Sequence, residues 1–212
     1  MLRLIPFRIR KWFPPGDPVA TAVAMLCVLR EDLLLELQGI IAEKLDRLDD
    51  NQSAYRRTYF WRNSLRTLEE IRKALNSLNS KPEFRDMLAR EPTNIRMAFD
   101  GLKRELNKAS EAFLRVLRNH VGGHLDAAMV QAGLDSMDHG QEGMIQFADT
   151  LGNIRYRFAV DVLWTALLRE VPGDNTESRL ENRLRATASL TPAVKAIDDV
   201  VACYLRARRL AS

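Results

Sequence analysis

Residues 93–116 carry the pattern that decides the fold, and they read TNIRMAFDGLKRELNKASEAFLRV. Apolar side chains recur in this stretch at alternating spacings of four and three residues. These side chains are Ile95, Phe99, Leu102, Leu106, Ala109, Phe113 and Val116. A helix with such a seam packs against two or more neighbouring helices. Residues 93–116 therefore predict a long helix in the interior of a helical bundle.

The chain before this helix predicts two more long helices. Asp17-Pro18 begins the first, with a carboxylate at the N-cap and proline at the first helical position. Its helical spacing of apolar residues continues to about Asp50. A second helical pattern begins at Ser53 and ends near Asn79. Ser80-Lys81-Pro82-Glu83 has the spacing of a capping box and predicts a short helix after it.

The chain after Asp126 predicts shorter elements. Residues 127–131 continue a helical pattern, and Gly133 to Gly143 has the punctuation of a loop. Met144 to Asp149 is compatible with a short extended piece, and Ile154 to Glu170 has clear helical spacing. Thr191-Pro192 leads into a last helix.

We therefore predict an all-α, up-and-down helical bundle with three long helices and two or three shorter ones. At 212 residues the chain is long enough for one sizeable core, so one domain is expected. We place a basic N-terminal arm at residues 1–16 and a single helical-bundle domain at residues 17–212.

The net charge of +4 comes entirely from the arm. Arg3, Arg8, Arg10 and Lys11 lie in the first eleven residues, where no acidic residue occurs, so the rest of the chain is neutral. Net charge therefore gives no argument for a protein that reads DNA sequence.

The cysteines, the histidines and the longest apolar run limit where the protein can be located and which cofactors it can hold. The longest apolar run, Val19 to Leu29, is too short to cross a bilayer, so no membrane association is expected. Cys27 and Cys203 lie in apolar helical patterns and predict free thiols in a reducing compartment, which we take to be the cytoplasm. Three histidines do not support a zinc site, and we expect no metal and no cofactor.

Basic and aromatic residues alternate in the second long helix. Between Tyr55 and Lys73 the chain carries Arg56, Arg57, Arg62, Arg66 and Arg72, mixed with Tyr59, Phe60 and Trp61. Such a mixture binds RNA through phosphate contacts and base stacking. The alternative is a solvated helix face whose rings pack inward.

The chemistry that packing explains least lies in residues 117–126, which read LRNHVGGHLD. Arg118, Asn119 and His124 gather there just after the long helical pattern, with His120 and Asp126 as supporting side chains. Two consecutive glycines, at 122 and 123, lower helix stability by about 1 kcal/mol each relative to alanine. They predict a helix break, a close backbone approach or room for a ligand.

This arrangement resembles the signature of the HEPN family of all-helical prokaryotic proteins. That signature is an arginine, usually followed by a polar residue, with a histidine four to six residues further on, and Arg118-Asn119 with His124 fits it. The resemblance implies metal-independent RNA cleavage at a homodimer interface, in proteins of defence or toxin type, with Arg118, Asn119 and His124 as site residues. Some members carry a tyrosine two residues after the histidine, where this chain has Asp126.

Two other hypotheses remain open for the same residues. A non-catalytic helical interaction or regulatory protein, with a protein partner, would use Arg118 and His124 to fix the packing of helices. A metal site would use His120 and His124 at a spacing of four, with Asp126, Asp138 or His139, but the chain has no His-Glu-x-x-His. Elsewhere, Asp32 and Glu36 lie one helical turn apart, as paired catalytic carboxylates or as partners of neighbouring cations.

Overall fold

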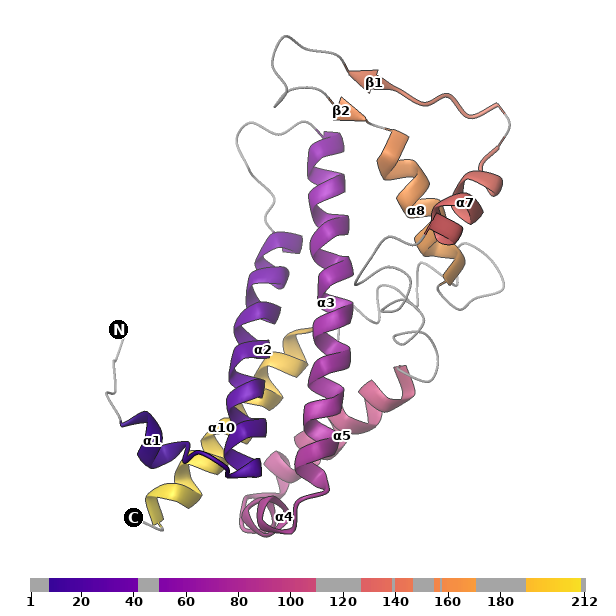
Figure 1. Ribbon diagram of the computed structural model, residues 1–212. Helices are drawn as coiled ribbons and strands as arrows, with labels where there is room; N and C mark the ends of the chain where they lie inside the picture. Colours follow the sequence, from indigo (N-terminus) through magenta and orange to yellow (C-terminus); the bar gives the residue numbers. More distant parts are fainter. Residues whose placement is uncertain are drawn as a thin grey trace.

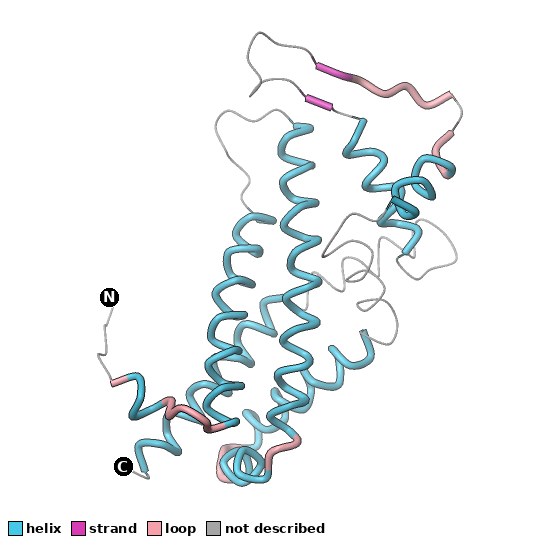
Figure 2. The backbone as a smooth tube through the Cα atoms, in the orientation of Figure 1, coloured by secondary structure: helices cyan, strands magenta, loops and turns pink. Residues whose placement is uncertain are grey.

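The computed structural model describes residues 8–41, 50–109, 127–138, 140–146, 155–156, 158–170 and 190–210. These residues are mostly helical (Figures 1 and 2), which confirms the predicted all-α helical bundle. No helix among them is long and apolar enough to span a membrane. The helices are α1 (Ile9–Trp12), α2 (Pro18–Ile41), α3 (Asp50–Asn79), α4 (Pro82–Ala89), α5 (Thr93–Ala109), α7 (Ala127–Asp135), α8 (Phe158–Glu170) and α10 (Leu190–Leu210).

The two longest helices, α2 and α3, form an antiparallel hairpin, and α10 crosses its lower half (Figure 1). Helices α4 and α5 close the same end of the bundle. Their shared core is built from apolar side chains that recur at helical spacing, as the sequence pattern predicted. Its fully buried members include Leu26, Leu33, Leu65, Leu68, Ile71, Leu75, Phe84, Phe99, Ile197, Val200 and Tyr204.

The start of α2 is fixed by the predicted cap. Asp17 Oδ1 accepts hydrogen bonds from the backbone N–H groups of Val19 at 2.8 Å and Ala20 at 2.9 Å. The Asp17 carboxylate also pairs with Arg208 near the end of α10. The first and last described helices of the main bundle are therefore joined through one side chain.

The described part of the arm, residues 8–16, packs against α10. The Tyr204 hydroxyl donates a hydrogen bond to the Trp12 carbonyl, and the rings of Phe13 and Tyr204 lie 5.3 Å apart. Residues 1–7 of the predicted arm lie outside the described residues.

The capping box predicted before α4 is wrong. Lys81 occupies the N-cap and makes no side-chain cap, while Ser80 Oγ donates to the carbonyl of Ser77 at 2.7 Å. Ser80 therefore belongs to the end of α3, and Pro82 begins α4 one residue later than a Ser80 cap would require.

The predicted loop from Gly133 is also wrong at its start, because α7 continues through Gly133 to Asp135. A Cβ at Gly133 would lie 2.9 Å from the Val162 carbonyl oxygen and 3.0 Å from the Ala166 Cβ. Glycine is thus required for the close approach of α7 and α8, not for a turn. The extended piece predicted from Met144 is present as β1 (Ile145–Gln146), which pairs antiparallel with β2 (Arg155–Tyr156). The helical pattern from Ile154 was therefore wrong at its start, because α8 begins at Phe158.

Helices α2 and α3 approach each other closely where Gly39 faces the Phe60 ring. A Cβ at Gly39 would lie 2.2 Å from the ring, well inside van der Waals contact. Gly39 therefore sets the distance between the two helices near the end of α2.

We expect Gly39→Ala to lower the free energy of unfolding by about 1–3 kcal/mol, because the new methyl group forces Phe60 to move. The control is Gly101→Ala in α5, where a Cβ meets nothing within 4 Å. That substitution is expected to raise stability by up to about 1 kcal/mol, because alanine favours the helix. Urea unfolding measures the free energy of unfolding of both variants. If Gly39→Ala raised it as much as Gly101→Ala does, the close approach of Gly39 to Phe60 would be contradicted.

Candidate functional site

The residues that the sequence singled out lie outside the described part of the chain. Arg118, Asn119, His120, His124 and Asp126 fall between the described end of α5 at residue 109 and the start of α7 at residue 127. His139 also lies outside the described residues. The structure therefore leaves the motif as a sequence prediction and describes the helices on either side of it.

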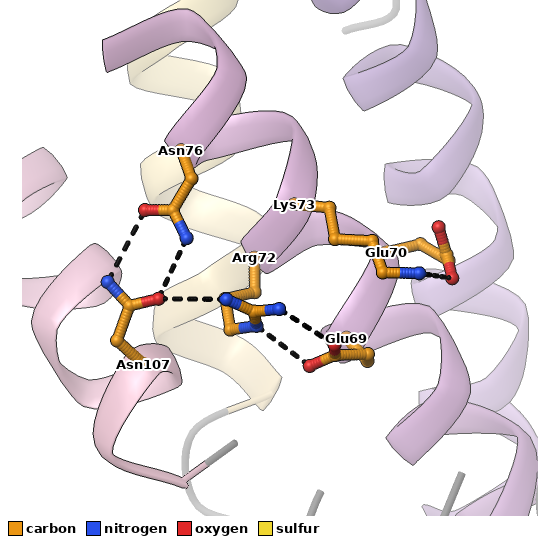
Figure 3. Close-up of polar contacts among 6 residues, drawn as sticks. All are labelled: Glu69, Glu70, Arg72, Lys73, Asn76 and Asn107. Carbon is orange, nitrogen blue, oxygen red and sulfur yellow. Dashed lines mark hydrogen bonds and ion pairs between the residues drawn. The ribbon is translucent and has the colours of Figure 1, made fainter. Parts of the chain in front are cut away.

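Helix α5, which leads to the motif, is held to α3 by a polar cluster shown in Figure 3. The Asn107 side-chain oxygen accepts hydrogen bonds from Arg72 Nη1 at 3.2 Å and from Asn76 Nδ2 at 2.8 Å. Asn107 Nδ2 donates back to the Asn76 side-chain oxygen at 3.3 Å. These bonds require α3 and α5 to pack in one register, since a shift of either helix would separate all three side chains.

The same cluster contains a buried carboxylate. Glu69 is 1% exposed, and both of its oxygens accept hydrogen bonds of 2.8 Å from Arg72. A bidentate pair of this kind satisfies the carboxylate and orients the guanidinium. The direction in which Arg72 points toward Asn107 is thus set by Glu69 (Figure 3).

A second buried carboxyl group, Glu36, lies between α2 and α3. Thr67 Oγ1 donates a 2.8 Å hydrogen bond to Glu36 Oε1, whereas Oε2 is buried without a partner. Burial raises the pKa of Glu36 to about 7, and the nearby Arg66 charge opposes part of that rise. Asp32 is exposed, and its charge adds to the rise in the pKa of Glu36, but the two carboxylates do not form a buried catalytic pair.

Four arginines of α3, Arg56, Arg57, Arg62 and Arg66, lie between residues 56 and 66. Helical spacing places Arg62 and Arg66 on one side of α3 with the ring of Tyr59, and we call these three residues the α3 arginine face. Within the described chain none of the four guanidinium groups makes an ion pair or a hydrogen bond. One nitrogen each of Arg56 and Arg62 is buried without an acceptor. These cations are therefore not used to hold the described fold together.

Rings hold two of these guanidinium groups in place. Arg56 Cζ lies 5.5 Å from the centroid of the Phe60 ring, and Arg62 Cζ lies 6.0 Å from that of Tyr59. The two rings meet edge to face at 5.4 Å. Tyr59 is 45% exposed, whereas Trp61 is buried in the core. The expectation of inward rings is thus right for Trp61 and wrong for Tyr59.

Other arginines behave differently, because each ties two parts of the bundle. Arg30 of α2 binds Asp198 of α10 at 2.6 Å, and Arg206 of α10 binds Glu91. Arg206 and Arg208 of α10 both pair with carboxylates that lie outside this helix. The sequence did not give these partners, since each is more than 100 positions away.

The described residues offer little for metal or thiol chemistry. They contain no group of three or more histidine, cysteine, aspartate or glutamate side chains arranged to hold a metal. Cys27 and Cys203 are free, and burial raises the pKa of both thiols, that of Cys203 to about 11. Neither is a good nucleophile, because the thiolate is the reactive form.

Comparison of the chain with family models, with curated proteins and with solved structures finds no match.

The raised pKa of Glu36 makes stability depend on pH. Between about pH 4.5 and 7 the unfolded carboxyl ionises while the folded one keeps its proton, so the free energy of unfolding falls as pH rises through this window. Glu36→Gln removes this loss. Urea unfolding measures the free energy of unfolding of both proteins. As pH rises from acid to mildly alkaline, we expect this free energy in the variant to increase by up to about 3 kcal/mol relative to wild type. The control is Asp86→Asn at an exposed position of α4, which is expected to keep the pH profile of the wild type. An unchanged pH profile in Glu36→Gln would contradict the assignment.

The Asn107 cluster predicts a coupled loss. Asn107→Ala leaves Arg72 and Asn76 without an acceptor in α5, so we expect the free energy of unfolding to fall by about 1–3 kcal/mol. Lys108→Ala, at the exposed neighbouring position, is expected to change it by less than about 0.5 kcal/mol. Adding Asn76→Ala to Asn107→Ala should destabilise by less than the sum of the two single effects. Additive effects would show that the two amides do not interact.

Proposed function

We propose that this protein is a HEPN-like RNA-binding protein of defence or toxin type that cleaves RNA without a metal ion. The observation that carries the proposal is the Arg118-Asn119 pair followed by His124 in an all-helical chain. The site residues are Arg118, Asn119 and His124, with His120 and Asp126 in support.

The side chains of the motif suit phosphodiester cleavage through the ribose 2′-hydroxyl. Histidine titrates near neutral pH, so His124 accepts the hydroxyl proton as the 2′-oxygen attacks phosphorus. The bond to the 5′-oxygen breaks, and that oxygen takes a proton from an acid such as a second histidine. Arg118 stabilises the charge that develops on the phosphate with a two-pronged hydrogen bond, and Asn119 orients it. A homodimer would supply two copies of each residue.

The surrounding fold supports this proposal in two ways. Helix α5, which precedes the motif in the chain, is kept in register by Asn107, a property that a precise site needs. The α3 arginine face offers cations that the described fold does not use. Both features are compatible with a site that handles a polyanion.

A non-catalytic interaction protein is the second candidate, and one surface favours it. An apolar groove of about 170 Å³ between α7 and α8 is lined by Val130, Leu134, Phe158, Val162 and Ala166 among others. Met144 and Tyr156, at 63% and 61% exposed, add apolar area in the neighbouring strand segment. Exposed apolar patches of this kind mark protein-binding sites.

The test is cleavage of unmodified RNA by the purified protein in the presence of a chelator. We expect cleavage that resists the chelator. His124→Ala should lower kcat by at least about 100-fold. Arg118→Ala should also lower kcat, and Arg118→Lys should restore it only in part.

The matched control for the histidine is His139→Gln, outside the motif, which should cleave as wild type does. Circular dichroism must show that each variant is folded. Absence of cleavage by wild type, with Arg118→Ala and His124→Ala both strongly destabilised, would reject the enzyme and favour the interaction protein.

A further inference from the structure

The α3 arginine face places an exposed ring and two cations along one side of a helix. Tyr59, Arg62 and Arg66 follow one another at spacings of three and four residues, so they share one side of α3 over about 10 Å of its axis. Tyr59 and Arg66 are exposed, and Arg62 is half-buried. The three side chains therefore form a continuous cationic and aromatic track.

The cations on this track have donors to spare. A guanidinium group carries five N–H donors, and none of those on Arg62 or Arg66 is used within the described residues. The Nε of Arg62 is buried, so a ligand reaches this side chain at its terminal nitrogens. The contact with Tyr59 limits the positions that the Arg62 side chain can adopt. An incoming acceptor thus meets a group that has already lost part of its conformational freedom, which favours binding.

A buried acid that interacts with Arg66 does not fully cancel these charges. Arg66 acts electrostatically on Glu36, and burial raises the pKa of Glu36 to about 7, so this carboxyl is partly protonated at neutral pH. A ligand that approaches Arg66 from solvent therefore meets positive charge with reduced internal compensation.

An aromatic ring beside cations selects among anionic ligands. Phosphate groups alone need only the arginines, whereas an unpaired base also stacks on an exposed ring. The bases of a duplex are already stacked and paired, and they do not reach such a ring. Tyr59 therefore favours a single strand over a duplex.

We propose that the α3 arginine face binds single-stranded RNA, with one unpaired base stacked on Tyr59 and phosphates held by Arg62 and Arg66. This assignment rests on the proposed function for the identity of the nucleic acid and for its fate after binding. It adds a binding surface on α3 that is separate in sequence from the Arg118 and His124 motif.

The test measures binding by fluorescence anisotropy with the full-length protein and a labelled single-stranded RNA that carries 2′-O-methyl groups. This probe lacks the attacking hydroxyl, so binding is measured without cleavage. Tyr59→Ala should weaken binding by at least about fivefold, and Tyr59→Phe should bind as wild type does. A labelled duplex should bind less tightly and be insensitive to Tyr59→Ala.

Charge is tested with two double variants of equal net charge. Arg62→Gln/Arg66→Gln should lower affinity by at least about tenfold and reduce the slope of log affinity against log salt by about 1.4, for two phosphate contacts. The matched control, Arg85→Gln/Arg104→Gln, removes two exposed arginines from α4 and α5 and should leave the slope within about 0.7 of wild type.

Equal losses in the two double variants, or no effect of Tyr59→Ala, would overturn the proposal, as would tighter binding of single-stranded DNA than of RNA. The cleavage assay separates this proposal from the preceding one. Tyr59→Ala should raise KM for unmodified RNA and leave kcat unchanged, whereas His124→Ala lowers kcat. Specific binding without cleavage would support RNA binding at the α3 arginine face and reject the nuclease. Cleavage that the α3 variants do not change would support the nuclease and reject RNA binding at the α3 arginine face.

Discussion

The packing of α3 against its neighbours is the constraint on which the rest of the described structure depends. Its buried residues, among them Trp61, Leu65, Ile71 and Leu75, supply much of the common core. Burial of such side chains contributes about 1.5–3 kcal/mol each. Helix α2 lies along one side of α3, α5 packs on another, and α8 contacts it as well (Figure 1). Displacement of α3 would therefore disturb all three neighbours at once.

One close steric contact and several polar residues fix the positions that apolar packing alone leaves free. Gly39 and Phe60 set the approach of α2 to α3, and Thr67 bonds the buried Glu36 between them. Asn107 performs the corresponding role between α3 and α5. Because apolar surfaces slide more easily than hydrogen-bonded pairs, these contacts select one register from several of similar apolar burial. One helix thus carries both the core and the groups that align its neighbours.

The sequence predicted what depends on local spacing and failed where distant partners decide. Apolar periodicity predicted the long helices, and the Asp17 cap is present as expected. Gly133 was taken for a loop residue, since nothing in the local sequence shows that Ala166 of another helix lies against it. The sequence left open whether Tyr59 points outward, and the partner of Glu36 was missed for the same reason. The motif residues Arg118, Asn119 and His124 remain a sequence prediction, because they lie outside the described residues.

The distribution of arginines connects the fold to the proposed activity. Arg30, Arg72, Arg206 and Arg208 are neutralised by carboxylates and hold helices together. If the arginines of α3 between residues 56 and 66 served stability in the same way, carboxylates would be expected beside them, and the described chain provides none in contact. Two of these arginines instead lie over aromatic rings, and each has a buried nitrogen without an acceptor, an arrangement that lowers stability unless something else compensates. The terminal nitrogens of Arg62 and the guanidinium of Arg66 have no acceptor within the described residues and are not among the buried atoms. A nucleic acid strand supplies both the negative charge that these groups lack and the bases that an exposed tyrosine binds.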